Sequence, residues 1–470
     1  MAYVVVLDDS ELQRIGEKLD IEQRLTKALP SSVHAPTGSP QLALVCSRSR
    51  IDQNLHPTAP DDSAVHSLAW LGMVMRPHGN NVGAVDKSIT IDPLRRCQVA
   101  VPLDGRNGLL SCLSSDHADR FWDALNSRIV TVLPVETRDD FIAAIRRRYS
   151  SLVKLLEWLL ALAEPSPLDS SRLEDRSWQE QQDSLGTLFR VAKFPVSAIA
   201  AWKRPADRDA TYLSGLIPEP FENALIEHDA RTTGNAFEDN LNVEGSRCDI
   251  QEFYDDHGRR LEVANINATP VESRLGADLI YYHEATSSFV LVQYKRLSSS
   301  KELYVDARLR TQMDRLDEVA KLSRPPRTPN DWRLSGDSCF LKLAHWPDGR
   351  PNDPRLPTQG MYLPVSYARM LLTDDCTRGP REGRVFSYDN VDRYLVTTQF
   401  AELVQHGLAG TIGTSVEQLR ELVVRRVREG YSVTAGVEHS TETARERQGR
   451  TRSRSTGKKG NGTAHQANLF

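Results

Sequence analysis

The sequence predicts an α/β (α+β) protein with two folded domains and a polar C-terminal tail. Runs of β-branched and aliphatic residues alternate with segments of helical apolar spacing, both in residues 1–165 and in residues 217–436. From about Glu438 onward Ser, Thr, Gly and basic residues dominate and apolar residues almost disappear, which is typical of a disordered segment. A chain of 470 residues is long enough for this organisation.

The amino-acid composition indicates which broad classes of protein the chain can belong to. The chain is 39% hydrophobic and 26% charged, as expected for a soluble globular protein. Its net charge of −4 means that any nucleic-acid binding must come from a local basic surface. The six cysteines include no Cys-x-x-Cys pair, so neither a zinc ribbon nor a disulfide framework is indicated. The N-terminal apolar run has no basic segment before it, and the longest apolar stretch, residues 158–163, is too short to span a bilayer. We therefore expect a cytoplasmic protein with no membrane association.

Residues 1–165 are expected to form a mixed α/β domain. The strands predicted from β-rich runs are 3–7, 41–46, 97–102 and 129–135, and the helices predicted from apolar spacing are 9–29 and 137–164. The sequence of this domain contains no catalytic motif that we can identify. Sensing, partner binding and a scaffold role all stay open for it.

A helical connector is expected between the two domains. Residues 165–171 are rich in Pro and Ser, which is typical of a linker. Residues 172–216 follow as a small helical segment, in which Trp178, Leu185 and Leu188 are spaced as an apolar stripe. This spacing favours a packed core over an aromatic surface for nucleic acid.

Residues 217–436 are expected to form the second α/β domain. Its predicted elements, in order, are a helix at 218–230, strands at 259–267, 276–283 and 289–296, a helix at 304–322 and a strand at 339–344. A short strand at 361–363 and helices at 391–406 and 415–429 form a predicted C-terminal extension.

Two strands of this domain form a predicted hairpin with a polar end. Glu284-Ala-Thr-Ser-Ser288 is a break of hairpin length between two β-rich runs. Because side chains alternate between the faces of a strand, Gln293 and Lys295 share one face near the end of the second strand. Asp278 stands near the start of the first strand, which is the same end of an antiparallel pair. Such groups cost stability at the end of an apolar hairpin unless they are paired or bind a metal.

This pattern resembles the PD-(D/E)xK nuclease superfamily, in the Gln-x-Lys form found in Mrr-type restriction enzymes. The matching residues are Gly276-Ala-Asp278 followed by Val292-Gln293-Tyr294-Lys295, and with the flanking elements the resemblance extends over residues 217–350. The resemblance implies a restriction-endonuclease-like core with the element order αβββαβ. It also implies Mg²⁺-dependent hydrolysis of DNA, with Mn²⁺ as an alternative cofactor.

The resemblance further implies roles for the polar side chains. Asp278 would anchor the metal, Gln293 would add its amide oxygen, and Lys295 would position or activate the attacking water. A second carboxylate would offset the negative charge that a glutamine lacks. The candidates for it are Glu272, which also counts as a candidate catalytic residue, and Glu222, Asp229 and Glu238.

Simpler explanations of the same residues stay open. Asp278 and Lys295 would form only a cross-strand ion pair, Glu222 and Asp229 would belong to a solvated helix start, and Glu272 would be a surface residue. The predicted function is a Mg²⁺-dependent DNA endonuclease in restriction, phage defence or replication-coupled repair. The alternative is a catalytically inactive protein of nuclease fold that binds nucleic acid or a partner. The sequence leaves the oligomeric state open, a dimer included.

Residues 437–470 are expected to form a disordered basic tail. The chain ends Gln466-Ala-Asn-Leu-Phe470, which resembles the peptide by which bacterial proteins bind the sliding clamp. In this resemblance Gln466, Leu469 and Phe470 dock into the hydrophobic pocket of the clamp. Ala467 stands where a leucine is more usual, and the alternative is an ordinary chain end.

Overall fold

A computed structural model gives the fold of residues 1–22, 24–29, 40–50, 64–74, 87–127, 129–163, 168–218, 244–254, 259–268, 276–346, 358–379 and 382–440, and of Phe237 and Pro270. The chain divides into a first unit, Met1–Ser166 with Ala201–Lys203 and Ile217–Pro220, and a second unit that holds the rest of the chain. Each unit combines a β-sheet with helices, so the predicted α/β class is confirmed.

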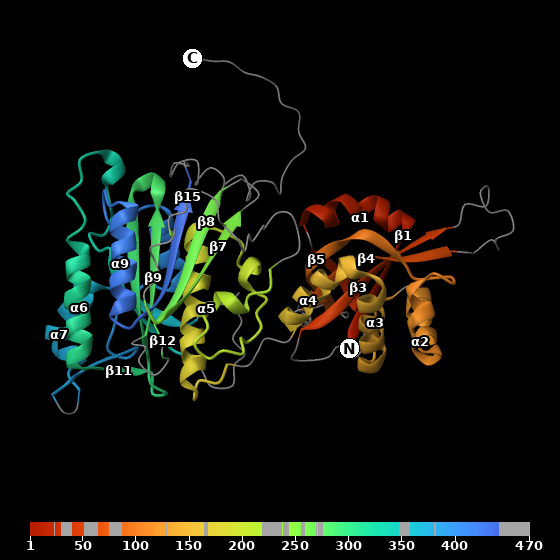
Figure 1. Cartoon of the computed structure of the whole chain (residues 1–470), viewed down its shortest axis with the longest axis horizontal. Coiled ribbons are helices and arrows are strands. Elements are labelled where there is room, and N and C mark those ends of the chain that lie inside the picture. The colour runs from red at the N-terminus through yellow and green to blue at the C-terminus, as the bar shows by residue number, and fades with distance from the viewer. Residues whose placement is uncertain are drawn as a thin grey trace, which may run out of the picture. The chain divides into compact units, whose positions relative to one another are not determined.

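The first unit is built on a six-stranded sheet. Its strands are β1 (Ala2–Asp8), β2 (Leu25–Leu29), β3 (Gln41–Arg50), β4 (Ala64–Val74), β5 (Lys87–Pro102) and β6 (Thr131–Leu133), in the order β2-β5-β4-β3-β1-β6. Its helices are α1 (Asp9–Glu22), α2 (Ser115–Asn126), α3 (Val135–Arg148) and α4 (Ser150–Ala163). β1 and β3 are parallel, and the other neighbouring strands are antiparallel. α1 and α4 pack on opposite faces of the sheet (Figure 1).

Two predicted helices of the first unit are wrong in extent. The helix predicted over residues 9–29 ends with α1, because its last residues pair with β5 as a strand, with Leu25 opposite Ile91. The helix predicted over residues 137–164 is instead the two helices α3 and α4, separated by the non-helical Tyr149 (φ −126°). The first error arose because leucines four residues apart fit a helix as well as they fit this short strand.

The second unit is built on a seven-stranded sheet. Its strands are β7 (Ser246–Tyr254), β8 (Arg260–Ala268), β9 (Ala277–His283), β10 (Ser288–Arg296), β12 (Cys339–Ala344), β13 (Gly360–Pro364) and β15 (Ser432–His439), in the order β13-β12-β10-β9-β15-β8-β7. β11 (Glu302–Val305) and β14 (Arg384–Ser387) form a separate antiparallel pair. The helices are α5 (Leu173–Ala192), α6 (Ala307–Ala320), α7 (Val365–Thr373), α8 (Thr397–Gln405) and α9 (Val416–Arg428).

Helices cover both faces of this larger sheet. α5 packs on one face, where the Leu188 side chain closes over Gly436 of β15. α6 and α9 pack on the other face and share an apolar core with Ile280 of β9 and Leu291 of β10. Figure 1 shows the strands between α5 on one side and α6 and α9 on the other. Each strand at the centre of the sheet is therefore buried on both faces.

The elements predicted between residues 259 and 344 are present, but the helix predicted from residue 304 begins at Ala307, because Tyr304 and Val305 belong to the strand Glu302–Val305. The predicted strand, hairpin, helix and final strand correspond to β8, β9, β10, α6 and β12, and the bounds of β12 agree with the prediction. The helix predicted over residues 218–230 lies outside the described residues. The predicted helices of the extension are present as α8 and α9.

The predicted start of the tail at residue 437 is wrong. Ser432–His439 forms β15, which lies between β8 and β9, antiparallel to β8 and parallel to β9. Glu438 is fully buried there, because its carboxylate accepts hydrogen bonds from Arg259, at 3.0 Å, and from the Tyr281 hydroxyl. A charged residue was taken as the start of a solvated tail, but its charge is paired inside the sheet.

The prediction that residues 172–216 form a connector between the two domains is also wrong. α5, the longest helix in residues 172–216, belongs to the second unit and contacts β9, β15 and α8. Trp178, Leu185 and Leu188 are buried, as the apolar stripe predicted. The helix is therefore one layer of the second unit, and its polar side chains lie close to the hairpin.

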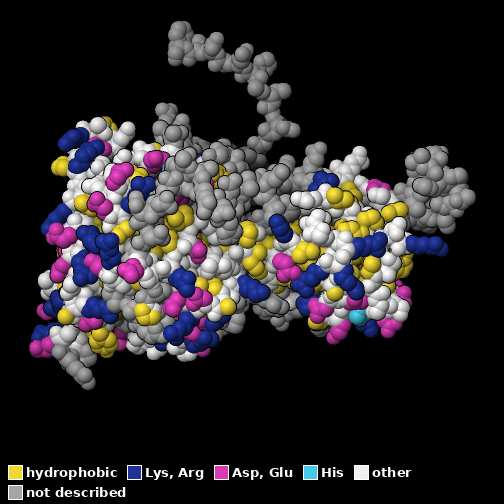
Figure 2. Space-filling model, viewed as in Figure 1, with side chains coloured by type: hydrophobic (Ala, Val, Ile, Leu, Met, Phe, Trp, Pro, Cys, Tyr) yellow, Lys and Arg dark blue, Asp and Glu magenta, His cyan; other side chains and the backbone are white. Residues whose placement is uncertain are grey.

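The described surface carries mixed charge. Figure 2 shows Lys and Arg side chains interspersed with Asp and Glu over the visible face of the second unit. Among the described helices, none is long and apolar enough to cross a membrane.

Candidate active site

The β9–β10 hairpin brings the predicted polar residues together. Asp278 and Gln293 lie directly opposite each other in the ladder, and the Gln293 side-chain nitrogen lies 3.3 Å from Asp278 Oδ1. Both side chains are fully buried, whereas Lys295, two residues further along β10, is partly exposed at the end of the strand. Gly276 enters β9 with a φ of 131°, a conformation that glycine adopts readily. Asp278, Gln293 and Lys295 thus share one face at one end of the hairpin, as predicted.

Asp278 has a charged partner that the sequence analysis missed. The Nε atom of Arg426 in α9 lies 2.6 Å from Asp278 Oδ2, and both side chains are almost completely buried. Burial raises the pKa of Asp278, although Arg426 and then Lys295 favour its charged form. Among the described residues, the ion pair of Asp278 is therefore with Arg426, and the cross-strand pair with Lys295, which was the alternative explanation of these residues, is not formed.

Arg426 has two further contacts besides Asp278. Its guanidinium lies 3.9 Å from the centre of the Tyr431 ring, and its Nη1 atom donates to Glu429 at 2.8 Å. Its sequence position gave a signal, because Leu419, Leu422 and Val423 precede it at helical spacing on the buried side of α9. A basic residue on an apolar helix stripe indicates a buried acidic partner.

The other side of Asp278 is polar and lies in the core. Burial raises the pKa of the Tyr431 hydroxyl, which lies beside the amides of Gln293 and Gln312. The Gln293 Oε1 atom is buried and has no hydrogen-bond partner among the described residues. An unpaired buried acceptor is costly, which makes this oxygen a candidate to accept a hydrogen bond from a ligand or to bind a cation.

Lys295 has the electrostatics of a reactive amine. Burial lowers its pKa from 10.5 to about 8, while the carboxylates of Asp278 and Glu180 act in the opposite direction. A pKa close to neutrality allows an amine both to hold and to release a proton under physiological conditions. Such a shift is typical of functional sites, although structural ion pairs also produce it.

Glu180 is the second carboxylate near the hairpin, and the sequence analysis did not select it. It lies on α5, accepts a hydrogen bond from the Ala277 N–H, and interacts electrostatically with Lys295. Burial raises its pKa, against the influence of Arg296, whose Nε atom lies 3.5 Å from Glu180 Oε1. No local sequence signal marks this residue, because its position depends on which sheet α5 covers.

The predicted second carboxylates are outside the described residues. These are Glu222, Asp229, Glu238 and Glu272, and their predicted roles stay predictions. Within the described part of the chain, no group of three or more His, Cys, Asp or Glu side chains could hold a metal ion. A cation at the hairpin would therefore depend on a mixed set of ligands.

Oxygen atoms of this kind fit a hard divalent cation such as Mg²⁺. Asp278 offers a carboxylate and the unpaired Gln293 Oε1 offers an amide oxygen on the α9 face of the sheet, whereas Glu180 lies on α5, which covers the other face. The Asp278 carboxylate is available only in part, since Arg426 occupies Oδ2 and the Gln293 amide nitrogen contacts Oδ1. The donor set therefore fits the cation, and Arg426 competes with it.

The predicted clamp-binding residues Gln466, Leu469 and Phe470 also lie outside the described residues. Comparison of the chain with family models, with curated proteins and with solved structures found no match.

Proposed function

We propose that the second unit is a Mg²⁺-dependent DNA endonuclease whose active site is the polar end of the β9–β10 hairpin. The observation that carries this proposal is the convergence of Asp278, Gln293 and Lys295 at one strand end, where the Glu180 carboxylate of α5 also acts electrostatically on Lys295. An ion pair alone would need neither the buried glutamine nor the second carboxylate. The biological settings proposed are restriction, phage defence and replication-coupled repair.

The side chains have complementary tasks in phosphodiester hydrolysis. Asp278 and Gln293 would hold Mg²⁺, which would supply charge neutralisation at the phosphate and polarise water. Lys295, with its pKa of about 8, takes a proton from the attacking water when neutral and stabilises phosphate charge when protonated. Arg426 keeps the Asp278 charge compensated when no cation is present.

The second candidate function is a catalytically inactive protein of nuclease fold that binds nucleic acid or a partner. The observation that favours it is the buried pair of Asp278 and Arg426, which would be complete without a metal. The two functions differ in one measurable property. An active site binds Mn²⁺ or Mg²⁺ through Asp278, whereas a structural pair does not.

Cleavage assays on the full chain test the proposal. Supercoiled, linear and single-stranded DNA are incubated with Mg²⁺ or Mn²⁺ and with Asp278→Asn, Lys295→Met or Glu180→Gln variants. We expect Lys295→Met to slow cleavage by about 10²- to 10⁴-fold, since it removes the proton-transferring group. Asp278→Asn and Glu180→Gln should also lose activity, because each removes a carboxylate from the site.

Matched controls separate chemistry from stability. Glu174→Gln changes a carboxylate on the same helix as Glu180, and Lys321→Met removes an exposed lysine at the end of α6. Both controls should cleave DNA at the wild-type rate. Cleavage that persists in both Asp278→Asn and Lys295→Met would rule out this site. DNA binding without cleavage or metal binding would favour the second function.

The C-terminal peptide supports a separate proposal, which is binding to the sliding clamp through Gln466, Leu469 and Phe470. Deletion of residues 466–470 should abolish binding to a purified clamp while DNA cleavage is unchanged. Equal clamp binding by the deleted and the full chain would end this proposal.

A further inference from the structure

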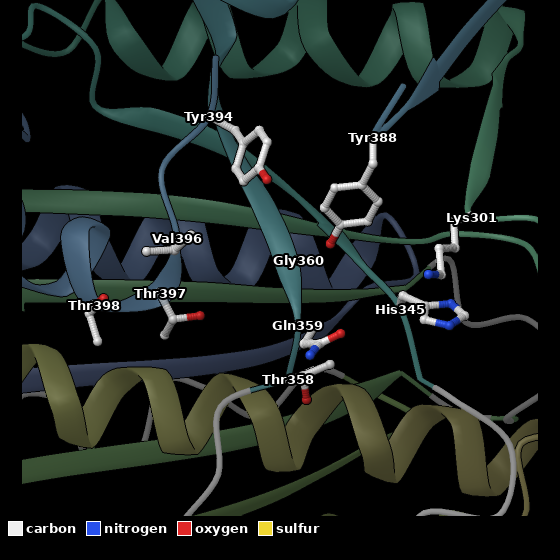
Figure 3. A pocket seen from close by; sticks show the side chains of 10 residues that line it. All are labelled: Lys301, His345, Thr358, Gln359, Gly360, Tyr388, Tyr394, Val396, Thr397 and Thr398. Atoms are coloured by element: carbon white, nitrogen blue, oxygen red, sulfur yellow. The ribbon is translucent and has the colours of Figure 1, made fainter. Parts of the chain in front are cut away.

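The second unit contains a pocket of about 400 Å³ apart from the hairpin residues. It lies beside the ends of β12 and β13, next to the β11–β14 pair and the first turn of α8 (Figure 3). Its volume is in the range of small-molecule sites. None of the four candidate active-site residues on β9, β10 and α5 lines it.

Backbone pairing places two tyrosines and a lysine around this pocket. Glu302 of β11 lies opposite Ser387 of β14, so the next residues outward, Lys301 and Tyr388, meet at the end of the ladder. Tyr394 precedes Leu395, whose backbone pairs with Tyr362 of β13 through hydrogen bonds of 2.9 and 3.0 Å. The rings of Tyr388 and Tyr394 are 5.8 Å apart in an edge-to-face arrangement.

One lining residue of the pocket is held by a buried ion pair. The backbone N–H of Thr358, a lining residue, donates to Asp183 Oδ1 at 3.1 Å. Asp183 in turn pairs with Lys342 of β12, and both are buried. The Lys342 ammonium lies 4.9 Å from the centre of the Tyr362 ring and therefore cannot swing away without losing two partners. The backbone of Thr358 is thus tied to the sheet at the edge of the pocket.

The lining groups divide into an aromatic side and a cationic side. Figure 3 shows the hydroxyls of Tyr388 and Tyr394 directed into the pocket, with Lys301 and His345 together at one edge. Tyr394 is 37% exposed, so part of its ring is accessible to a ligand. Tyrosine rings stack on planar bases, and an ammonium group binds a phosphate.

Lys301 stands at a backbone position that favours glycine. Its φ of 61° lies in the left-handed region, where a side chain is strained. Its N–H donates to the Ser298 carbonyl at 2.9 Å, which closes a tight turn after β10. A glycine would close this turn with less strain, so the lysine contributes something other than the turn.

We propose that this pocket binds a nucleoside 5′-phosphate, with the base against Tyr388 and Tyr394 and the phosphate at Lys301 and His345. The nucleotide is either free in solution or an unpaired nucleotide of a DNA strand, and both present the same base and phosphate. The inference does not depend on the proposed nuclease activity, since it rests on different residues.

Calorimetric titration of the full chain tests this proposal with four probes. These are deoxyadenosine 5′-monophosphate, deoxyadenosine, inorganic phosphate and a single-stranded oligodeoxyadenylate. The mononucleotide should bind more tightly than the nucleoside or phosphate alone. Preference for the oligonucleotide would identify a DNA strand as the source, and preference for the mononucleotide would identify the free ligand; either result supports the site.

Two variants divide the site into its parts. Tyr394→Ala should weaken nucleotide binding by about 5- to 150-fold through loss of stacking. Lys301→Gly should weaken nucleotide binding by about tenfold or more and leave nucleoside binding unchanged. Because Lys301→Gly relieves backbone strain, it should not lower the urea midpoint, so a loss of binding cannot be attributed to unfolding.

Control variants use similar residues of the same unit. Tyr304→Ala removes a tyrosine that is 62% exposed on β11 and does not line the pocket, and Lys321→Ala removes an exposed lysine. Both should bind nucleotide like the wild type. The proposal is overturned if neither nucleotide probe binds, or if Tyr394→Ala and Lys301→Gly bind as well as the controls.

Discussion

Replacing Arg426 with methionine tests what the buried carboxylate at the hairpin is for. Arg426 is 2% exposed and Asp278 is fully buried, with Nε and Oδ2 2.6 Å apart. Methionine keeps much of the side-chain volume and removes the charge, which leaves Asp278 buried and unpaired. Breaking a buried pair on one side costs about 3–5 kcal/mol. We expect the free energy of unfolding of Arg426→Met to fall by that amount near neutral pH in the absence of metal.

The loss should depend on pH with a defined sign. Burial already raises the pKa of Asp278, and removal of the guanidinium raises it further. Above the ordinary pKa of an aspartate, the folded variant then holds a proton that the unfolded chain has released. Its stability therefore falls as pH rises, and the gap to the wild type should widen from about pH 4 to about pH 7. The double variant Asp278→Asn/Arg426→Met should recover most of the loss, because no buried charge remains.

Metal addition distinguishes a cation site from a structural pair. If Asp278 is a ligand for which Arg426 competes, Mn²⁺ should stabilise Arg426→Met more than the wild type. A concentration ten times the dissociation constant would add about 1.4 kcal/mol. Asp278→Asn should gain nothing from the metal.

The assay is urea denaturation, with hydrogen exchange of β9 and α9 peptides to locate the change within the second unit. Arg369→Met is the control, because its partners Asp314 and Asp317 are 67% and 46% exposed, and such surface pairs contribute at most about 1 kcal/mol. A neutral effect of Arg426→Met, or equal metal stabilisation of Asp278→Asn, would refute this reasoning.

Three further predictions concern the second unit. A methyl group at Gly436 would lie 2.5 Å from the side chain of a buried leucine in α5, so Gly436→Ala should lower the free energy of unfolding by about 1–3 kcal/mol. The control Gly383→Ala has open space around it and should not lower this free energy. Equal urea midpoints of the two variants would contradict the position of β15. In the metal-free chain, the pKa of Lys295 is about 8 in the folded state and 10.5 in the unfolded state. As pH rises between these values, the free energy of unfolding of the wild type should increase by about 3 kcal/mol relative to that of Lys295→Met. A difference between the two proteins that does not change with pH would disprove the shift. Lys342→Met should cost about 3–5 kcal/mol in urea denaturation, and adding Asp183→Leu should restore most of it; a single variant as stable as the wild type would show that the pair is not buried.

The hairpin was predictable because its determinants are local. The two runs are rich in β-branched, aromatic and aliphatic residues and are joined by a five-residue polar break, so their identity as strands follows from neighbouring residues alone. The shared face of Gln293 and Lys295 then follows from the alternation of side chains along a strand. The same applies to β12, whose bounds agree with the prediction. Helix α9 was found from its spacing, but the partner of its buried arginine was not.

Three of the errors, at β15, β2 and Glu180, share one physical cause, which is long-range pairing. β15 contains Gly436 and is followed by polar residues, so its sequence gives only a weak strand signal. It lies at the centre of the sheet because both β8 and β9 supply hydrogen-bonding partners. β2 is a strand because it pairs with β5, far along the chain. Glu180 was not selected because the spacing of α5 predicts a helix but not the sheet that this helix covers. Local propensity cannot determine these contacts.

The strand directions explain why the residues of the two proposed sites lie at one end of the sheet in the second unit. β10 and β12 are parallel, with Lys295 opposite Leu343 and Arg296 opposite Ala344. The carboxyl ends of both strands therefore lie at the same end of the sheet. The chain that leaves β10 carries Lys301, and the chain that leaves β12 carries His345, which places the nucleotide pocket at the same edge as Lys295. Lys295 and Lys301 are six residues apart, so an extended chain separates their Cα atoms by at most about 20 Å. A DNA strand that placed an unpaired nucleotide in the pocket would therefore have phosphates within a few nucleotides of Lys295. If both proposals hold, Tyr394→Ala should raise the KM for single-stranded DNA and leave kcat unchanged, and an unchanged KM would mean that the two sites act on different ligands.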